Sequence, residues 1–362
     1  MTKLPGVPTV DGRIGSLLAG SRRASDAVPS SRAELRGRSH SSAVTVRDLL
    51  PAVLALTASL ALAAGCDMPE PGDDREEQGA VFMRPGGGGG IWLNTSAIDS
   101  HAFAALDLKK NSHDGVRLDR VLVKQGANKF VVVDRVKGVD GEIHAGRGTT
   151  NFSGQQLVGS KWELTLLVNG TETPATMWIS GATNNQGVWQ YTFQHHDALG
   201  NVANLCETDA HGKAVAVPIA DMTVNASTGD LTSRNNTLYL ACTSGALGKA
   251  VTWGYSPWDI GMDEFEATIR VVRADYCGDG QSWTTPGTSL QIEDAWGVSG
   301  FAVPTATNEA VWGASGALCI ATTRVIGQGA ITCDGVVVPT CAANVSLTNP
   351  AGALLWTKNA PM

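Results

Sequence analysis

The stretch that decides the fold is Trp162–Ser180, WELTLLVNGTETPATMWIS. Apolar and polar residues alternate through Trp162–Val168, the period that places one face of a β-strand against a core. Asn169-Gly170 then interrupts the pattern, and Asn-Gly between two apolar runs is the strongest short-range signal for a two-residue hairpin turn. The second run, Thr176–Ser180, therefore predicts the returning strand of an antiparallel pair.

Alternating runs of this kind recur through most of the chain beyond residue 91. In Val188–Gln194, VWQYTFQ, the three aromatic side chains share one face and the polar ones share the other. Arg120–Lys124 and Lys129–Val136 flank Gln125–Asn128, which is predicted to be a hairpin loop. Further runs of strand character are TLYLAC (237–242), TSLQIED (288–294), ALCIATTRV (317–325) and ALLWTK (353–358). The pattern, punctuated by the chain's 42 glycines, predicts a mainly β fold whose body is an antiparallel sandwich or a barrel-like sheet.

One segment, residues 263–277, is predicted to be a short helix instead. The residues of its apolar stripe, spaced at i, i+4, i+7 and i+11, are Phe265, Ile269, Val272 and Tyr276. We expect Asp263 at the N-cap or in the first turn, where an acid is favourable. Gly278 is placed to end the helix in the left-handed conformation.

The apolar run of residues 49–65 lies near the N-terminus and is short for a membrane-spanning helix. It ends in small residues and is followed by an acidic tract, as in a secretory signal peptide. Its last residues, Leu62–Cys66 (LAAGC), resemble a bacterial lipobox, in which the cysteine is acylated and becomes the mature N-terminus. We therefore interpret residues 44–65 as a lipoprotein signal peptide and Cys66 as the lipidation site. The alternative is a buried helix that happens to end on a cysteine.

The residues on either side of this signal complete the predicted organisation. Residues 1–43 are rich in serine and arginine and form a leader, unless translation starts later, near residue 44. Residues 66–90 comprise the acylated cysteine and an acidic, glycine-rich tether with the composition of a flexible coil. Beyond the tether we expect a β-rich N-terminal region over 91–232 and a second domain over 233–362. This organisation predicts a protein anchored by lipid in the cell envelope, facing the periplasm or the cell surface.

Six cysteines follow the lipidation site, and all of them lie after residue 200. They are Cys206, Cys242, Cys277, Cys319, Cys333 and Cys341. An even number in an exported chain indicates three disulfides, and the lack of a Cys-x-x-Cys pair disfavours a zinc ribbon or a redox motif. Among the pairings open to six cysteines we favour near neighbours in the chain. That pairing is Cys206–Cys242, Cys277–Cys319 and Cys333–Cys341.

The segment Val272–Gly280, VRADYCGDG, carries a resemblance to a known family. Together with WGYSPW (253–258) and PGTSLQIEDAWG (286–297), it resembles the ADYC domain, an uncharacterised family of exported proteins in myxobacteria and their relatives. The likeness is specific through 233–362 and looser back to about residue 145. The motif residues are Ala274, Asp275, Tyr276, Cys277, Gly278, Asp279 and Gly280. The resemblance implies no activity, because the family has none established.

The motif has some residue types of a calcium loop. Asp275, Asp279 and Gly280 match its start, but Cys277 and Pro286 stand where the loop needs an oxygen ligand and a glutamate. A carboxylate at the end of a helix also opposes the helix dipole, so we expect loop N–H groups, a nearby arginine or a cation to compensate Asp275. We interpret the segment as a turn held by hydrogen bonds, with a metal loop as the alternative.

Other candidate sites are weaker. His195 and His196 are adjacent in a predicted strand and so point to opposite faces, and Asp197 begins a turn. Cys277 would have to be free and beside a base to act as a nucleophile, which three disulfides disfavour. The sequence contains no G-x-S-x-G, no H-E-x-x-H and no phosphate loop.

These observations favour a binding or structural module over an enzyme, with no catalytic residue, metal or cofactor assigned. The net charge is -7, and the first 66 residues hold eight basic against four acidic side chains, so the rest of the chain is more acidic still. An acidic body repels phosphate backbones, and nucleic acid is therefore not an expected partner. The expected partners are the membrane, through the anchor, and an envelope protein or polysaccharide. Two alternatives remain open, a secreted hydrolase with an unrecognised site and a carbohydrate-binding module that uses exposed members of the chain's ten tryptophans.

Overall fold

The computed structural model describes residues 91–284, 287–298, 306–325, 327–343, 347 and 350–360. Every described residue belongs to one compact unit, which lies within Glu70–Met362. The predicted leader, signal peptide and tether, together with Cys66, lie outside the described residues. Among the described helices, none has the length and apolar character needed to cross a bilayer.

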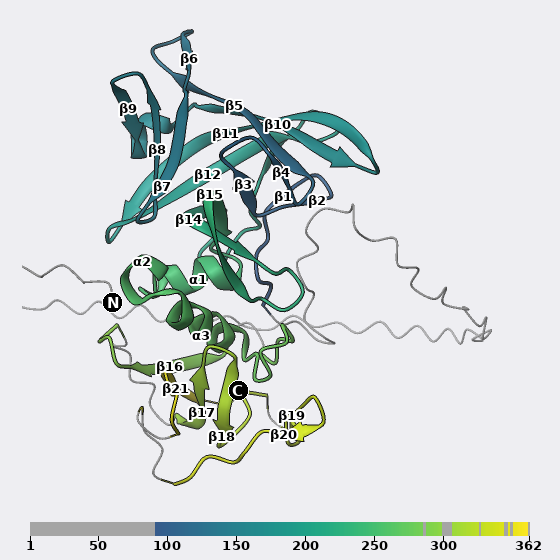
Figure 1. Cartoon of the computed structure of the whole chain (residues 1–362), viewed down its shortest axis with the longest axis vertical. Coiled ribbons are helices and arrows are strands. Elements are labelled where there is room, and N and C mark those ends of the chain that lie inside the picture. The colour runs from purple at the N-terminus through teal and green to yellow at the C-terminus, as the bar shows by residue number, and fades with distance from the viewer. Residues whose placement is uncertain are drawn as a thin grey trace, which may run out of the picture. The chain divides into compact units, whose positions relative to one another are not determined.

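The largest element is an antiparallel sheet of ten strands (Figure 1). Its strand order is β3-β15-β14-β12-β11-β10-β5-β4, with β13 beside β12 and β6 beside β5. The strands are β3 (Ala105–Asp107), β4 (Ser112–His113), β5 (Val116–Lys124), β6 (Phe130–Val132), β10 (Lys161–Val168), β11 (Thr171–Asn185), β12 (Val188–His196), β13 (Val202–Asn204), β14 (Ala216–Val224) and β15 (Leu231–Cys242).

Both predicted hairpins are present in this sheet. Strands β10 and β11 pair in register from Val168 opposite Thr171, so the connecting loop consists of Asn169 and Gly170 alone. These two residues have φ of 50° and 73°, as a turn with two left-handed residues requires. Strands β5 and β6 are joined through the predicted Gln125–Asn128 loop.

A smaller sheet covers one face of the large one and makes a sandwich, which confirms the predicted fold class. It contains β7 (Arg135–Val139), β8 (Glu142–Arg147) and β9 (Thr150–Ser153), followed by the 3-10 turn η1 (Gly154–Leu157). Ile143 and Ala145 of β8 are buried in the same core cluster as Trp162 and Phe193 of the large sheet. The backbone N–H of Ile143 also donates to the hydroxyl of Tyr191 at 3.1 Å.

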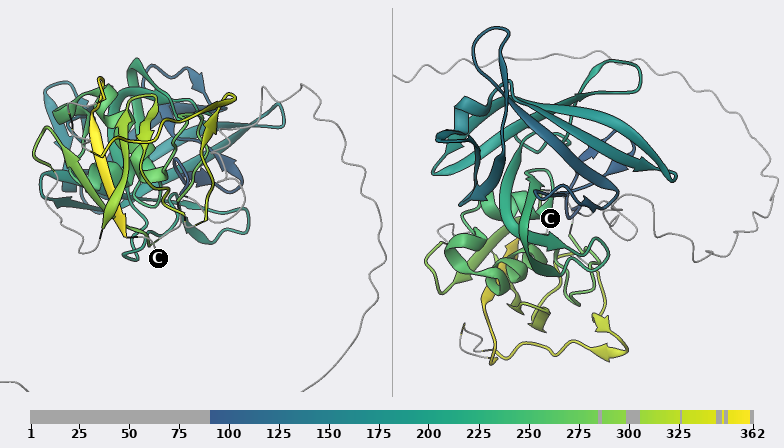
Figure 2. Two further views of the ribbon diagram at one scale, coloured as in Figure 1. Left: turned by 90° about the horizontal axis from the view of Figure 1, so that it is seen from below. Right: turned by 45° about the horizontal axis from the view of Figure 1, so that its top comes forward.

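In the described part of the chain, three helices lie between the large sheet and a second, C-terminal sheet (Figures 1 and 2). They are α1 (Ala246–Thr252), α2 (Pro257–Ile260) and α3 (Met262–Arg273). The C-terminal sheet has the order β16-β21-β17-β18 and consists of β16 (Ser289–Asp294), β17 (Thr307–Gly313), β18 (Gly316–Ile320) and β21 (Leu355–Ala360). Two short hairpins complete the described elements, β1 (Ala97–Ile98) with β2 (His101–Ala102) and β19 (Thr332–Cys333) with β20 (Val336–Val337).

Helix α3 is buried on both sides, so it is not the one-sided amphipathic helix that its stripe predicted. Phe265 and Ile269 pack in the cluster that includes strands β14 and β15. Ala267 and Val271, on another face, pack with Trp312 of the C-terminal sheet. The helix therefore joins the two sheets into one described body.

A single β-strand runs across the predicted domain boundary. The boundary after residue 232 falls within β15, which runs from Leu231 to Cys242 and pairs with β14 along its length. The region before the boundary and the first residues after it therefore share one sheet.

Candidate ligand-binding cleft and the disulfide-bonded corner

Helix α3 ends four residues earlier than predicted, at Arg273. Ala274 adopts the left-handed conformation, with φ 52° and ψ 42°, at a cost of about 1–2 kcal/mol for a residue with a Cβ. The N–H of Asp275 bonds to the carbonyl of Arg270 and that of Ala274 to Val271, at 2.9 and 3.1 Å. This is the Schellman pattern of a helix end, with alanine in the place usually taken by glycine.

Gly278, predicted to end the helix, serves a different purpose. Its φ is +67°, and a Cβ there would lie 2.2 Å from the carbonyl oxygen of Ser315 in the turn between β17 and β18. Gly316 faces it, where a Cβ would lie 2.6 Å from the carbonyl oxygen of Tyr276. The two backbones therefore touch directly, and the N–H of Ala317 donates to the Tyr276 carbonyl at 2.8 Å. At this close approach glycine is required on both sides.

The negative charge of the Asp275 carboxylate is stabilised by an arginine and by loop N–H groups, as the sequence suggested. Its Oδ2 accepts from Nη1 of Arg270 and from the N–H of Gly280, both at 2.9 Å, and its Oδ1 accepts from the N–H of Asp279 at 3.1 Å. Arg270 is itself buried and also pairs with Glu266 at 3.1 Å. Burial raises the pKa of the Asp275 carboxyl to about 6, against the lowering influence of Arg270.

Tyr276 anchors the disulfide-bonded corner, which is the motif segment of residues 274–280, in the C-terminal core. Its ring stacks on Trp312 with centroids 5.2 Å apart. Its hydroxyl donates to Glu309 at 2.9 Å and accepts from the backbone N–H of Arg324 at 2.8 Å. Glu309 is fully buried and pairs with the guanidinium of Arg324 at 2.9 Å. The tyrosine thus closes a buried polar network.

All six cysteines of the body form disulfides, but two of the predicted pairs exchange partners. Cys206–Cys242 is confirmed, whereas the other bonds are Cys277–Cys333 and Cys319–Cys341. The near-neighbour prediction failed because residues 339–341 run beside β18. There the N–H of Ile320 donates to the Pro339 carbonyl at 2.9 Å and that of Cys341 to the Ile320 carbonyl at 3.1 Å, which brings Cys341 to Cys319.

Each motif residue from Ala274 to Gly280 therefore has a structural contact that accounts for it. The side-chain oxygens of Asp275 are occupied by donors, and Oδ1 of Asp279 accepts from the N–H of Gln281 at 2.9 Å. Cys277 is disulfide-bonded. Within the described residues, no group of three or more His, Cys, Asp or Glu is arranged to hold a metal ion.

The histidine pair separates as its position in a strand predicted. His195 is buried, with Nδ1 3.1 Å from the carbonyl of its neighbour, while His196 is exposed, with Nδ1 3.1 Å from the carbonyl of Gly200. Asp197 accepts from the N–H groups of Leu199 and Asn201 and closes a turn. The structure does not bring these three side chains together around one point.

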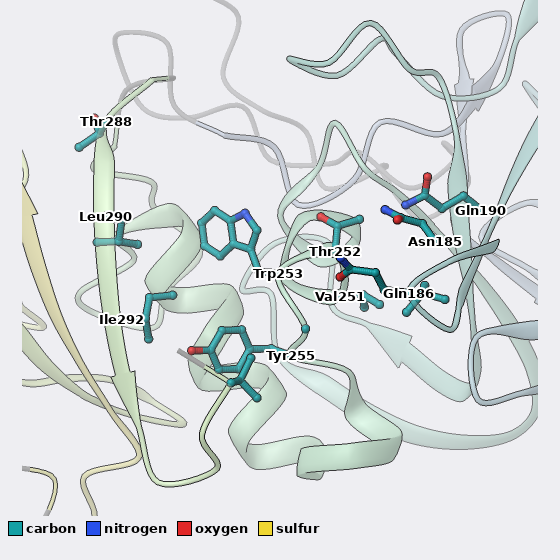
Figure 3. A pocket seen from close by; sticks show the side chains of 13 residues that line it. Asn185, Gln186, Gln190, Val251, Thr252, Trp253, Tyr255, Thr288, Leu290 and Ile292 are labelled. Atoms are coloured by element: carbon teal, nitrogen blue, oxygen red, sulfur yellow. The ribbon is translucent and has the colours of Figure 1, made fainter. Parts of the chain in front are cut away.

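A cleft of about 570 Å³ lies instead at the end of helix α1. Three elements form its walls: the turn between β11 and β12, the segment that follows α1, and strand β16 with the loop after it (Figure 3). The lining residues are Asn185, Gln186, Val188, Gln190, Val251, Thr252, Trp253, Gly254, Tyr255, Thr288, Leu290, Ile292 and Val298. None of these side chains is charged at neutral pH.

Close packing fixes helix α1 at this place. A Cβ on Gly248 would lie 2.3 Å from the carbonyl oxygen of Cys242, so the helix packs directly on the end of β15. The Cys206–Cys242 disulfide ties the same strand end to the loop after β13. The wall formed by residues 251–255 therefore follows a helix that packs on a strand end held by a disulfide.

Trp253 is the central side chain of the cleft. It follows α1 directly, and its backbone N–H donates to the carbonyl of Lys249 at 3.0 Å. The residue is 40% exposed. Among the described residues it is the one exposed aromatic side chain. Figure 3 shows the indole standing between the apolar side chains of Leu290 and Ile292 and the polar wall that includes Asn185.

Tyr255 connects the cleft to the loop after β16. The tyrosine is buried, and its hydroxyl donates to Oδ2 of Asp294 at 2.7 Å. Oδ1 of the same aspartate accepts from the N–H groups of Trp296 and Gly297, at 2.7 and 2.6 Å. Burial raises the pKa of Tyr255, so the phenol stays protonated as the donor. Asp294 also accepts from the N–H of Val298 at 3.2 Å, so it links two residues that line the cleft, Tyr255 and Val298.

Sequence reasoning considered exposed tryptophans but did not single out Trp253. Its position in the sequence carries a signal, since Trp253 is followed directly by Gly254, a residue type that favours turns. A tryptophan at such a turn is poorly placed for a core. What could not be inferred is that the turns 185–190 and 288–298 would face it.

The chain was compared with known protein families, curated proteins and solved structures. The sequence model of the ADYC domain matches residues 154–326, which run from η1 through β18 and include the motif residues 274–280 and the lining of the cleft. No curated protein and no solved structure matches the chain. Through residues 154–326 the chain belongs to the ADYC domain family.

Proposed function

We propose that this protein is a lipid-anchored binding module of the cell envelope that holds a saccharide in the cleft around Trp253. The observation that carries the proposal is the exposed indole, placed between an apolar wall and a wall of side-chain amides. A ligand that fits this cleft has an apolar face and a rim of hydroxyl groups, which is the chemistry of a sugar ring.

The two walls supply the two kinds of contact that a sugar needs. The C–H groups on one face of a pyranose pack against an aromatic ring, and indole offers the largest such surface among the side chains. The amides of Asn185, Gln186 and Gln190 each carry both donors and an acceptor, so they can pair with hydroxyl groups in either sense.

Binding is favoured over hydrolysis by the composition of the walls. Glycoside hydrolysis uses a pair of carboxyl groups on either side of the scissile bond, and acyl transfer uses a nucleophile beside a base. The described lining residues include no Asp, Glu, His or Cys. The cleft has the contents of a small-molecule binding site, mostly apolar with a few convergent polar groups.

The lipid anchor rests on the sequence alone. An apolar signal-like run that ends at Cys66, followed by an acidic and glycine-rich tract, supports a lipidated mature N-terminus. A flexible tether of this length spans roughly 25–30 Å, so the cleft would stand clear of the lipid headgroups. The partners proposed are therefore the membrane, through the anchor, and an envelope polysaccharide.

The test is a binding assay with a panel of neutral and acidic oligosaccharides, read by calorimetry on the folded chain from residue 67 onward. Trp253→Ala should weaken the best ligand of the panel by at least about tenfold, the loss expected for one stacked aromatic contact. The matched control is Leu199→Ala, since Leu199 is 87% exposed and lies outside the cleft.

Because Trp253 is substantially exposed, the melting temperature of Trp253→Ala should stay close to that of the wild type. A panel in which nothing binds, or equal affinities for wild type and Trp253→Ala, would refute the proposed function.

A further inference from the structure

A second hollow, of about 190 Å³, adjoins the cleft and, unlike the cleft, is lined by ionisable side chains. The two share a wall made of Asn185, Gln190, Thr252 and Trp253. The second hollow is otherwise lined by Asp209, Ala210, His211, Lys213, Thr243 and Lys249. A ligand stacked on the indole therefore has an uncharged cleft on one side and a cluster of ionisable groups on the other.

Neither lysine of this hollow forms an ion pair within the described part of the chain, although Asp209 lines the same hollow. No ion pair or hydrogen bond joins the Nζ of Lys213 or Lys249 to another described side chain. Lys249 lies on α1 one turn before Trp253, so both side chains project from the same side of the helix end. Burial lowers the pKa of the Lys249 ammonium, against the raising influence of Asp209.

Asp209 is the one carboxylate among the described residues that line the hollow, and both of its oxygens already accept hydrogen bonds. Its Oδ2 accepts from the hydroxyl of Thr243 at 2.7 Å, and its Oδ1 accepts from the N–H groups of His211 and Lys213 at 2.8 and 2.9 Å. Burial acts to raise the pKa of Asp209, but these bonds together outweigh it and lower the pKa, which keeps the carboxylate ionised. Its contacts hold the 209–213 loop in place, while the two lysines leave the hollow net positive in a chain of net charge -7.

Gln190 gives an independent sign of a missing ligand. It is 4% exposed and lies in the wall that both hollows share. Its Oε1 is buried and has no hydrogen-bond partner among the described residues. A buried acceptor left unpaired costs roughly 1–3 kcal/mol, so a ligand N–H or O–H placed here would recover that energy.

The hollow is also structurally defined. The Cys206–Cys242 disulfide joins the strand that precedes α1 to the residues just before the 209–213 loop. The N–H of Thr243 donates to the carbonyl of Val215 at 3.0 Å, beyond the other end of that loop. The charged groups are thus held near the indole by one covalent bond and by the Thr243–Asp209 contact.

We propose that the second hollow binds the carboxylate of an acidic saccharide. The carboxylate lies at Lys249 and Lys213, the sugar ring stacks on Trp253, and a ring hydroxyl or amide of the ligand donates to Oε1 of Gln190. This inference rests on the proposed function and names its ligand class, a uronic acid or another carboxylated sugar rather than a neutral one.

The test compares matched ligands that differ only in the carboxylate. The probes are oligosaccharides of glucuronate, mannuronate and galacturonate, and the same oligosaccharides after reduction of the carboxyl to a hydroxymethyl group. The wild type should bind at least one acidic oligosaccharide about tenfold or more tightly than the reduced form of the same oligosaccharide. Added salt should lower the ratio of these two affinities.

Variants then locate the preference. In the double variant Lys249→Gln with Lys213→Gln, the affinities for the acidic and the reduced oligosaccharide should become nearly equal, and the reduced oligosaccharide should still bind. Lys249→Arg should retain most of the preference for the acidic oligosaccharide. The matched control is Lys129→Gln, an exposed lysine in the β5–β6 loop that lies outside both hollows. Melting temperatures of all variants establish that each is folded.

The outcomes separate the two proposals. If reduced and acidic oligosaccharides bind equally well, or if the preference survives loss of both lysines, the acidic-ligand inference is wrong and the saccharide site stands. If no oligosaccharide of either series binds the wild type, both proposals are wrong. Loss of acidic preference in the double variant alone, with the Lys129→Gln control unchanged, supports the inference.

Discussion

The hydroxyl of Tyr276 donates a hydrogen bond of 2.9 Å to Oε1 of Glu309, a carboxylate that is fully buried. The same carboxylate pairs with Arg324, and the backbone N–H of Arg324 donates to the tyrosine oxygen. A buried ion pair costs free energy unless its remaining hydrogen-bonding groups find partners. Tyr276 supplies such a partner, and this explains why the third letter of the motif is a tyrosine.

Replacing Tyr276 with phenylalanine should therefore destabilise the fold through the network alone. The ring can still stack on Trp312, but Glu309 loses a donor and the Arg324 N–H loses its acceptor. We expect the free energy of unfolding to fall by about 1–3 kcal/mol, measured by denaturant titration. A double-mutant cycle with Glu309→Gln should show strong non-additivity; additive effects, or a loss within experimental error, would contradict this account.

The buried carboxyl of Asp275 should give the stability a distinct pH dependence. Its pKa is about 6 in the folded protein, against about 3.9 for an aspartate in an unfolded chain. The folded state binds the proton more tightly, so the wild type loses stability as the pH rises from about 4 to about 6. Asp275→Asn does not titrate there and is expected to be less stable by about 1–3 kcal/mol at neutral pH.

The difference in free energy of unfolding between the wild type and the less stable Asp275→Asn should consequently be largest below about pH 4. It should become smaller towards pH 6 and stay constant above that pH. Denaturant unfolding of both proteins at a series of pH values measures the difference. A deficit that widens as the pH rises would mean that the attraction of Arg270 outweighs burial, and the sign of the Asp275 pKa shift would be wrong.

Loss of either of two disulfides should lower stability, but loss of only one of them should also change saccharide binding. Loss of Cys277–Cys333, as a double alanine variant, should cost roughly 2–4 kcal/mol and raise protease sensitivity while leaving saccharide affinity unchanged. Loss of Cys206–Cys242 should cost a similar amount and also weaken the preference for acidic saccharides, because it releases the loop that carries Lys213. Equal effects of the two variants on binding would argue against the proposed role of that bond.

Cys66 should carry the lipid. Metabolic labelling with a fatty-acid analogue is expected to mark the wild type and not Cys66→Ser, and the variant should appear in the soluble fraction. The control is Cys277→Ser, which removes a cysteine of the body and should remain labelled. Labelling of Cys66→Ser at the wild-type level would contradict the lipoprotein interpretation.

The sequence alone determined the features that depend on local chemistry. Alternation and the Asn169-Gly170 pair predicted the β10–β11 hairpin, since only a short turn with two left-handed residues fits between such strands. The even number of cysteines predicted three disulfides, and the apolar stripe predicted a helix over 263–277. The resemblance to the ADYC family, which the family match confirms, was also visible in local motifs.

The tertiary structure decided what depends on contacts between distant segments. The helix ends at Arg273 because Ala274 is held left-handed while Gly278 is needed where two backbones meet. Cys319 pairs with Cys341 because residues 339–341 run beside β18, a register that spacing does not encode. Likewise, Trp253 and Lys249 are close in sequence, but only the packing of α1 between the β11–β12 turn, the 209–213 loop and β16 makes them walls of adjoining hollows. Long-range packing sets such positions, and its free energy is shared among many residues rather than written in any one segment.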